Sequence, residues 1–206
     1  MAKKTKSYHH GDLARALVLA GRDLLQEQGI DALSLRTVAA QVGVSRTAPY
    51  AHFPDKKSLL RAICATGFAD LTAAMEARRA PDLTSANQII AFGEAYVAFA
   101  LEHLNLYRLM ISIMTPVTDT AAEPDSQDQL VIVAQRPYAL LLTEFALLVR
   151  DPKRAEILSQ GAWSAVHGLA SLIGDGLITP PPEGAGEILR ILMETQARPP
   201  AQSGGG

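Results

Sequence analysis

The chain has 206 residues, a formal net charge of −2, 5% aromatic residues and one cysteine. This length suffices for one large domain or two small ones with a buried core. A single cysteine excludes a disulfide framework and a cysteine metal cluster, and it fits a reducing, cytoplasmic location. Leu, Ala, Glu, Gln and Arg at helical spacing predict an all-α protein. We expect no metal and no cofactor.

Charge is distributed unevenly along the chain. Residues 1–57 carry nine Lys and Arg against five Asp and Glu, a net charge of +4, and the remainder carries −6. The small overall charge by itself argues against nucleic-acid binding. A basic first quarter on an acidic body, however, is the layout expected of a DNA-binding protein with a separate second domain.

The N-terminal segment begins with a basic tail that lacks the apolar core of a signal peptide. The first helix is expected over roughly residues 10–28, because Leu13, Leu17 and Leu24 share one face. Gly29 then supplies a stop signal.

A helix-turn-helix is predicted over about residues 34–52. Ser34 is suited to cap its first helix, whose inner face is marked by apolar residues at a 3.6-residue period. Gly43 stands at the sharp turn, where a left-handed backbone is often needed. Ser45 is expected to cap the second helix, which this motif places in the DNA major groove. The residues in the first turn of that helix are Arg46, Thr47 and Ala48.

Six further helices follow. The first of them is capped by Asp55, runs to about Arg79 and joins the two halves of the chain. The others are expected over about 84–103, 104–114, 127–149, 153–174 and 184–197.

Local signals fix several of these ends. Ser126 and Gln129 form a plausible capping box, and Asp151 followed by Pro152 is typical of a helix start. Pro137 predicts a kink inside its helix. The longest uncharged run, residues 157–174, includes several polar side chains, so we expect a buried helix there and no membrane span.

Two regions of the sequence resemble a known family. The run from Thr37 to Leu60, T-V-A-x-x-V-G-V-S-R-T-A-P-Y-x-H-F-x-D-K-x-x-L-L, resembles the DNA-binding domain of the TetR family of bacterial transcriptional repressors. The segment Trp163-Ser-Ala-Val-His167-Gly168 resembles the W-x-x-x-H-G motif of one subgroup, as does the opening Tyr8-His-His-Gly-Asp12-Leu13. The resemblance covers roughly residues 7–197. Thr47 and Pro49 depart from the residues common in the family.

The predicted DNA contacts lie in and around the second helix of the motif. Arg46 can fork onto guanine O6 and N7, and the methyl groups of Thr47 and Ala48 can touch a thymine methyl. Ser34, Arg36 and Thr37 are expected to meet phosphate, and the resemblance implies the same role for Tyr50, His52 and Lys56. The full predicted set is Ser34, Arg36, Thr37, Ser45, Arg46, Thr47, Ala48, Tyr50, His52 and Lys56. The expected partner is double-stranded DNA with a palindromic operator.

The resemblance also implies an inducer cavity between the helices of the second domain. Trp163 and His167 lie one helical turn apart, so a ligand could meet both; the alternative is a packed Trp beside a hydrogen-bonded His. Few charges are available to line a cavity, which favours a small, largely apolar effector. The predicted ligand-binding residues are Phe68, Tyr96, Phe99, Tyr107, Met110, Met114, Tyr138, Trp163 and His167.

A homodimer is expected, because a single helix-turn-helix buries little surface and dimers match paired half-sites. The last two helices are the predicted interface, since their small residues, among them Gly161 and Gly168, allow close packing. The predicted domains are a DNA-binding domain over 1–54, a ligand-binding and dimerisation domain over 55–198, and a disordered tail over 199–206.

We interpret the sequence as a transcriptional repressor released from DNA by its effector. The alternatives are a helical interaction protein that no longer binds DNA, and an activator without a small-molecule inducer. An enzyme is disfavoured because the sequence contains no His-x-x-x-His pair, phosphate-binding glycine loop or Gly-x-Ser-x-Gly elbow.

Overall fold

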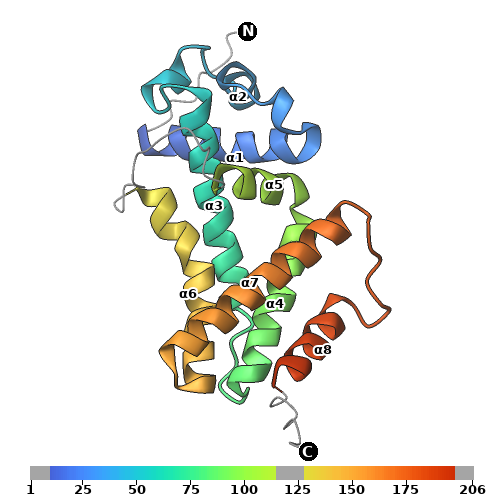
Figure 1. Ribbon diagram of the computed structural model, residues 1–206. Coiled ribbons are helices and arrows are strands. Elements are labelled where there is room, and N and C mark those ends of the chain that lie inside the picture. Colours follow the sequence, from blue (N-terminus) through green and yellow to red (C-terminus); the bar gives the residue numbers. More distant parts are fainter. Residues whose placement is uncertain (1–9, 115–127, 198–206) are drawn as a thin grey trace, which may run out of the picture. The chain divides into compact units, whose positions relative to one another are not determined.

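The computed structural model describes residues 10–114 and 128–197 (Figure 1). Within these ranges the chain forms α-helices, 3-10 helices and turns, and no strand, which confirms the all-α fold. The elements are α1 (His10–Gln28), η1 (Ile30–Ala32), α2 (Leu35–Val42), η2 (Ala48–Ala51), α3 (Lys56–Glu76), α4 (Ser85–Glu102), α5 (Leu104–Met114), α6 (Gln129–Val149), α7 (Pro152–Gly174) and α8 (Ala185–Ala197).

The helices begin and end where local signals in the sequence place them. The Ser34 hydroxyl accepts a hydrogen bond from the Thr37 backbone N–H at 3.1 Å, and the Thr37 hydroxyl accepts one from the Ser34 N–H at 2.9 Å, which is a complete capping box. Gly43 ends α2 with a left-handed φ of 78°. Asp55 accepts from the Ser58 N–H at 2.7 Å, and Asp151 caps α7. These predicted caps are confirmed.

The second helix of the motif differs from the prediction. The expected α-helix from Ser45 is a turn followed by the four-residue 3-10 helix η2, so eight α-helices are described in place of about nine. Pro49 has no N–H to donate to the Ser45 carbonyl, and the Ala48 N–H bonds to that carbonyl at 3.1 Å. Tyr50 and His52 likewise donate three residues back, to Thr47 and Pro49. The bonding is therefore of the 3-10 type.

The start of α6 lies next to residues 115–127, which are outside the described ranges. Ser126, the first residue of its predicted capping box, lies outside the described residues, as does the predicted tail. Instead, Asp128 accepts a hydrogen bond from the Leu130 N–H at 2.9 Å and pairs with Arg61 of α3. The carboxylate of Asp128 thus caps α6 and ties its first turn to α3.

The described residues divide into two compact units. Unit 1 contains the chain up to Ala69 together with 103–134, and unit 2 contains 70–102 and the chain from Gln135 onward. In unit 1, α1 packs against α2 and α5, and Asn105 of α5 donates to the Leu25 carbonyl of α1 at 3.2 Å. The domain boundary predicted after residue 54 stays a prediction.

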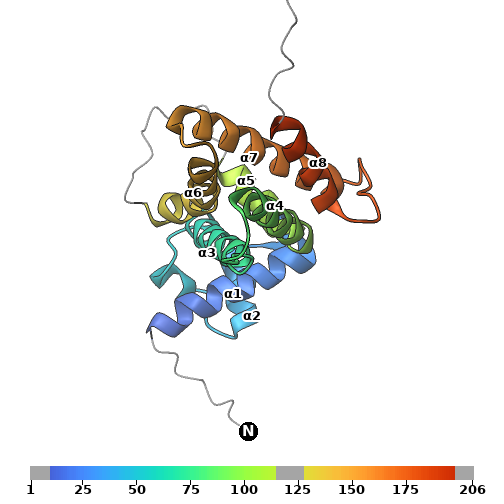
Figure 2. The ribbon, with the colours of Figure 1, turned by 90° about the horizontal axis from the view of Figure 1, so that it is seen from below.

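In unit 2, α4 packs against α7 and α8 (Figure 2). The core of this unit includes Phe92 and Tyr96 of α4 and Phe145 of α6, all nearly inaccessible to solvent. By length and composition α6 could cross a membrane. Its Leu141, Glu144 and Phe145 are buried, however, which is the packing of a core helix.

Candidate nucleic-acid interface and cavity

The turn before η2 presents polar side chains to solvent. Ser45, Arg46 and Thr47 are exposed, Ala48 is half-buried and Pro49 is buried. The Ser45 hydroxyl accepts a hydrogen bond from the Ala48 N–H at 3.2 Å and lies 3.1 Å from the Thr47 hydroxyl. This local bonding fixes the backbone on which Arg46 and Thr47 stand, so both side chains are accessible for contact with a base edge.

A concave surface lies where the N-terminal ends of α2 and α3 meet. Ser34, Arg36, Tyr50, Asp55 and Lys56 are among the residues that line it. The two helix N-termini and the two basic side chains favour an anion there, and a DNA phosphate fits that chemistry.

Several polar side chains of this surface are already engaged in hydrogen bonds within the protein, which limits their contact with a phosphate. Lys56 donates from Nζ to the Ile30 carbonyl at 3.0 Å, so its ammonium is already held at the rim. Hydrogen bonding from the backbone and side chain of Ser58 lowers the pKa of Asp55, which caps α3 as an anion. The hydroxyls of Ser34 and Thr37 are used in their own capping box.

All ten predicted DNA-contact residues lie in one stretch of unit 1, from the start of α2 to the start of α3. Ser34, Ala48 and His52 are half-buried, and the other seven are exposed. Sequence analysis missed Leu35, Pro54 and Asp55, which also line the concave surface. The position of Asp55 could have been predicted from the sequence, because its role as the cap of α3 places it at the helix N-terminus that borders this surface. The contacts themselves stay predictions.

Unit 2 contains a small, partly open apolar cavity of about 40 Å³. Every helix of the unit contributes to it: Met75 from α3, Phe92, Gly93 and Tyr96 from α4, Leu141 from α6, Trp163 and Val166 from α7, and Leu189, Leu192 and Met193 from α8. The Tyr96 hydroxyl and the Trp163 indole N–H are the polar groups of these lining side chains. The cavity therefore suits a neutral, largely apolar molecule.

An aromatic cluster adjoins this cavity. The His167 ring nitrogen Nδ1 lies 2.8 Å from the Trp163 carbonyl, which can only accept, so Nδ1 carries the proton. His167 Nε2 then accepts a hydrogen bond from the Tyr96 hydroxyl at 3.0 Å. Burial lowers the pKa of His167, and its bond to the Trp163 carbonyl opposes that shift. Trp163 also contacts the Tyr138 ring, with 5.7 Å between ring centroids. The imidazole is thus a neutral acceptor held in one orientation.

The structure brings together some of the predicted ligand-binding residues and separates others. Tyr96, Tyr138, Trp163 and His167 form the cluster in unit 2, where Phe99 is buried but does not line the cavity. Phe68, Tyr107 and Met110 are instead buried in unit 1, and the side chain of Met114 lies outside the described ones. Sequence analysis missed the aliphatic wall from α8, because leucine and methionine at helical spacing are typical of any core helix.

Two family models match the chain. Residues 17–63 match the bacterial regulatory proteins of the tetR family, and residues 89–196 match the Tetracyclin repressor-like C-terminal domain. No curated protein matches the sequence.

Solved structures with the same fold cover nearly the whole chain. A protein with unknown function from Rhodococcus sp. RHA1 is 32% identical, with a TM-score of 0.73, covering 92% of this chain and 96% of that one. A TetR-like transcriptional regulator from the same organism is 17% identical, with a TM-score of 0.64 and coverages of 92% and 97%. The multidrug binding protein EbrR, complexed with imidazole, is 20% identical, with a TM-score of 0.58 and coverages of 92% and 97%. The chain therefore belongs to the TetR family of bacterial regulators, which are DNA-binding proteins and not enzymes.

Proposed function

We propose that the protein is a homodimeric repressor that leaves a palindromic operator when a small apolar molecule occupies the cavity of unit 2. The observation that carries this proposal is the apolar cavity, about 40 Å³ in volume and flanked by Tyr96 and His167, in a chain that also carries a helix-turn-helix. Ligand sites in helical bundles lie between helices, and this cavity has that position.

In the proposed complex Arg46 and Thr47 contact base edges, while the concave surface between α2 and α3 receives a phosphate. Arg46 would donate two hydrogen bonds to a guanine, a contact that contributes about 1–3 kcal/mol to discrimination between bases. Arg36 and the two helix N-termini would hold the backbone and make the affinity depend on salt.

The proposed effector is neutral and largely apolar, with a polar group that can reach the Tyr96–His167 pair. The lining side chains carry no formal charge, so burying an ionic group among them would be costly. Met75 and Met193 are flexible side chains that can adapt to several shapes. Binding of imidazole by EbrR supports the idea that this fold accommodates small molecules, and gives no identity for the effector here.

The proposed dimer interface is the outer surface of α7 and α8. Ile157, Leu172 and Ile191 are exposed on these helices, and such apolar side chains together favour a protein partner. A Cβ atom built on Gly161 or Gly168 meets nothing within 4 Å, so these glycines leave room for a second helix to approach closely. Two copies related by a twofold axis would place two DNA-binding heads against two half-sites.

Effector release is then a shift between two populations. A molecule that binds better to one arrangement of unit 2 favours that arrangement, and α3 continues from unit 2 into the DNA-binding unit. Coupling of about 1–3 kcal/mol would change operator affinity by roughly 5–150-fold.

The test is a fluorescence-anisotropy titration of the protein with the DNA flanking its own gene, at two salt concentrations. We expect tight, sequence-dependent binding that weakens with salt, and a loss of about 1–3 kcal/mol in Arg46→Ala. Arg136→Ala, at an exposed arginine on α6 and away from the proposed interface, is the matched control. Binding no stronger than to random DNA, in this assay and in selection from a random DNA pool, would favour the helical interaction protein. Higher transcription from the bound promoter would favour an activator.

A further inference from the structure

The cavity of unit 2 is too small for the proposed effector unless one wall moves. Its volume of about 40 Å³ holds only a few water molecules, whereas sites for drug-sized ligands measure about 300–1,000 Å³. The wall that moves at least cost is the one whose separation strands the fewest buried polar groups.

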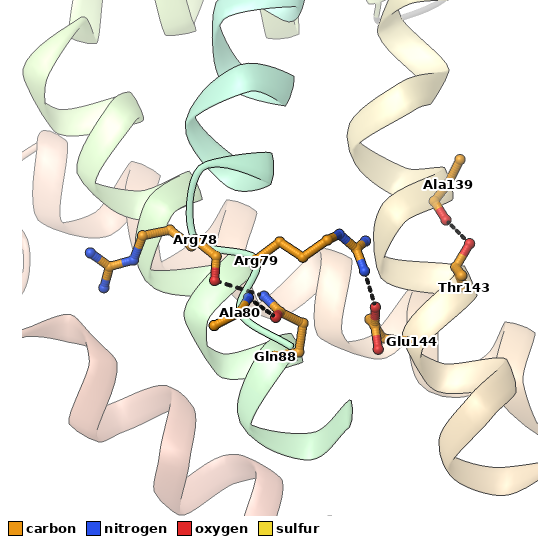
Figure 3. A network of polar contacts seen from close by, with 7 residues as sticks. All are labelled: Arg78, Arg79, Ala80, Gln88, Ala139, Thr143 and Glu144. Atoms are coloured by element: carbon orange, nitrogen blue, oxygen red, sulfur yellow. Dashed lines mark hydrogen bonds and ion pairs between the residues drawn. The ribbon is translucent and has the colours of Figure 1, made fainter. Parts of the chain in front are cut away.

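Polar contacts tie the connection between α3 and α4 to both α4 and α6 (Figure 3). Gln88 of α4 donates to the Arg78 carbonyl and accepts from the Ala80 N–H, both at 3.1 Å, which fixes the end of α3 to α4. Arg79 donates to Glu144 of α6 at 2.9 Å. Because Gln88 and Glu144 are buried, separating α3, α4 and α6 would strand polar groups away from water.

The fourth wall, α7, is held by its aromatic cluster. Trp163 and His167 contact Tyr96 of α4, and Trp163 contacts Tyr138 of α6. The Tyr96–His167 hydrogen bond adds a polar tie between α4 and α7. Moving α7 would therefore break packing against two other helices at once.

The remaining wall, α8, packs closely against α4, but its contacts are mainly hydrophobic, and they include Met193 against the buried cluster of Ile89, Leu141 and Phe145. Leu189 sits over Gly93 of α4, where an added Cβ would lie 2.8 Å from the Leu189 Cδ1 atom. Arg190 approaches Glu94 at 4.0 Å, a partly exposed ion pair at the limit of contact, so it contributes little. The connection between α7 and α8 includes Gly176 and Gly184. Both have a positive φ, which glycine adopts more readily than any other residue.

We propose that Leu189 is a removable plug, that the effector takes its place over Gly93, and that α8 moves outward as it does so. This inference rests on the proposed function. It makes Gly93 the residue that determines how deeply an apolar group enters, since any larger side chain fills the space that Leu189 leaves. It also means that occupancy of the cavity is transmitted directly to a helix of the proposed dimer interface.

The experiment locks α8 to α4 with a disulfide and measures binding of a dye. A Cβ built on Gly186 lies 2.9 Å from the Glu94 Cγ atom. A disulfide places each Cβ about 3 Å from the partner sulfur, so Glu94→Cys with Gly186→Cys fits this geometry. The natural Cys64 does not interfere, because burial raises its pKa to about 12 and leaves it a protonated thiol.

The probe is N-phenylnaphthylamine, a neutral apolar dye that absorbs where tryptophan emits. Trp163 is the single tryptophan, so energy transfer from it reports dye bound to the protein, and the cross-linked and Leu189→Ala variants decide whether that dye lies in the cavity. We expect the reduced double variant to bind the dye and the oxidised form to bind it at least ~10-fold more weakly. The reduced form of the same protein is the control, with unchanged circular dichroism as the check on folding.

Each other outcome has a definite meaning. Equal binding by the oxidised and reduced forms would overturn the plug while leaving an apolar effector site intact. Binding by neither form would overturn the apolar site, and with it both proposals. Leu189→Ala, which needs no cross-link, should bind the dye more tightly than the parent, whereas Leu177→Ala, at an exposed leucine, should not. Unchanged binding in Leu189→Ala would also overturn the plug.

Discussion

The Arg79–Glu144 ion pair should respond very differently to the loss of either partner. The Glu144 side chain is 6% exposed and the Arg79 side chain is 46% exposed. In Glu144→Gln, the half-exposed guanidinium of Arg79 stays hydrated. It can also keep its contact with the Phe92 ring, whose centroid lies 5.3 Å from the guanidinium carbon. In Arg79→Met, the Glu144 carboxylate stays buried without its cation. The second substitution should therefore be the more destabilising.

The magnitudes follow from how much of the pair is buried. Removing one partner of a fully buried pair costs about 3–5 kcal/mol. Because Arg79 is half exposed, the cost of Arg79→Met is expected to be lower, about 2–3 kcal/mol. Glu144→Gln should cost about 1 kcal/mol, the net contribution of a typical hydrogen bond, because the amide that replaces the carboxylate keeps an acceptor and buries no charge.

Arg78→Met is the matched control. Arg78 is 54% exposed and pairs with Glu94, which is 30% exposed, so its loss should cost less than about 1 kcal/mol. The assay is urea unfolding of each variant followed by the fluorescence of Trp163, which lies in the same unit. The reasoning would be refuted if Glu144→Gln lowered the free energy of unfolding as much as Arg79→Met does. It would also be refuted if Arg78→Met lowered it as much as Arg79→Met.

Three further predictions concern single positions. Gly43→Ala should lower the free energy of unfolding by about 1–2 kcal/mol and Gly43→Asn by less, because φ is 78° and no neighbour obstructs a Cβ; equal losses in the urea midpoint would contradict this. Burial lowers the pKa of His167, so the unfolded chain takes up its proton first as pH falls below the ordinary 6.5. The stability advantage of the parent over His167→Gln should therefore shrink between about pH 7.5 and about pH 5.5, and an advantage that grew on acidification would count against it. Gly168→Leu should dissociate the proposed dimer in analytical ultracentrifugation while Gly176→Asn, in the α7–α8 connection, should not; a Gly168→Leu dimer would place the interface elsewhere.

The helices and their ends could be predicted from the sequence because their causes are local. The Ser34 and Asp55 caps, the left-handed Gly43 and the proline after Asp151 act through bonds between residues at most a few positions apart. The prediction failed locally at Pro49, where the motif's family pattern indicated an α-helix. The cause is visible in the sequence, because a proline has no N–H for the i to i−4 bond of an α-helix. The hydrogen bonds around Pro49 instead join residues three positions apart.

The composition of the site was decided only by tertiary packing. Phe68 and Tyr107 have the same apolar character as Tyr96 and Trp163, yet the first two fill the core of unit 1 and the last two adjoin the cavity of unit 2. The cavity joins residues as distant in the chain as Met75 and Met193, and the burial of Glu144 depends on which helices surround it. Helical periodicity shows which side of a helix is buried but not which helix covers it, because the hydrophobic effect that drives burial has no preferred direction.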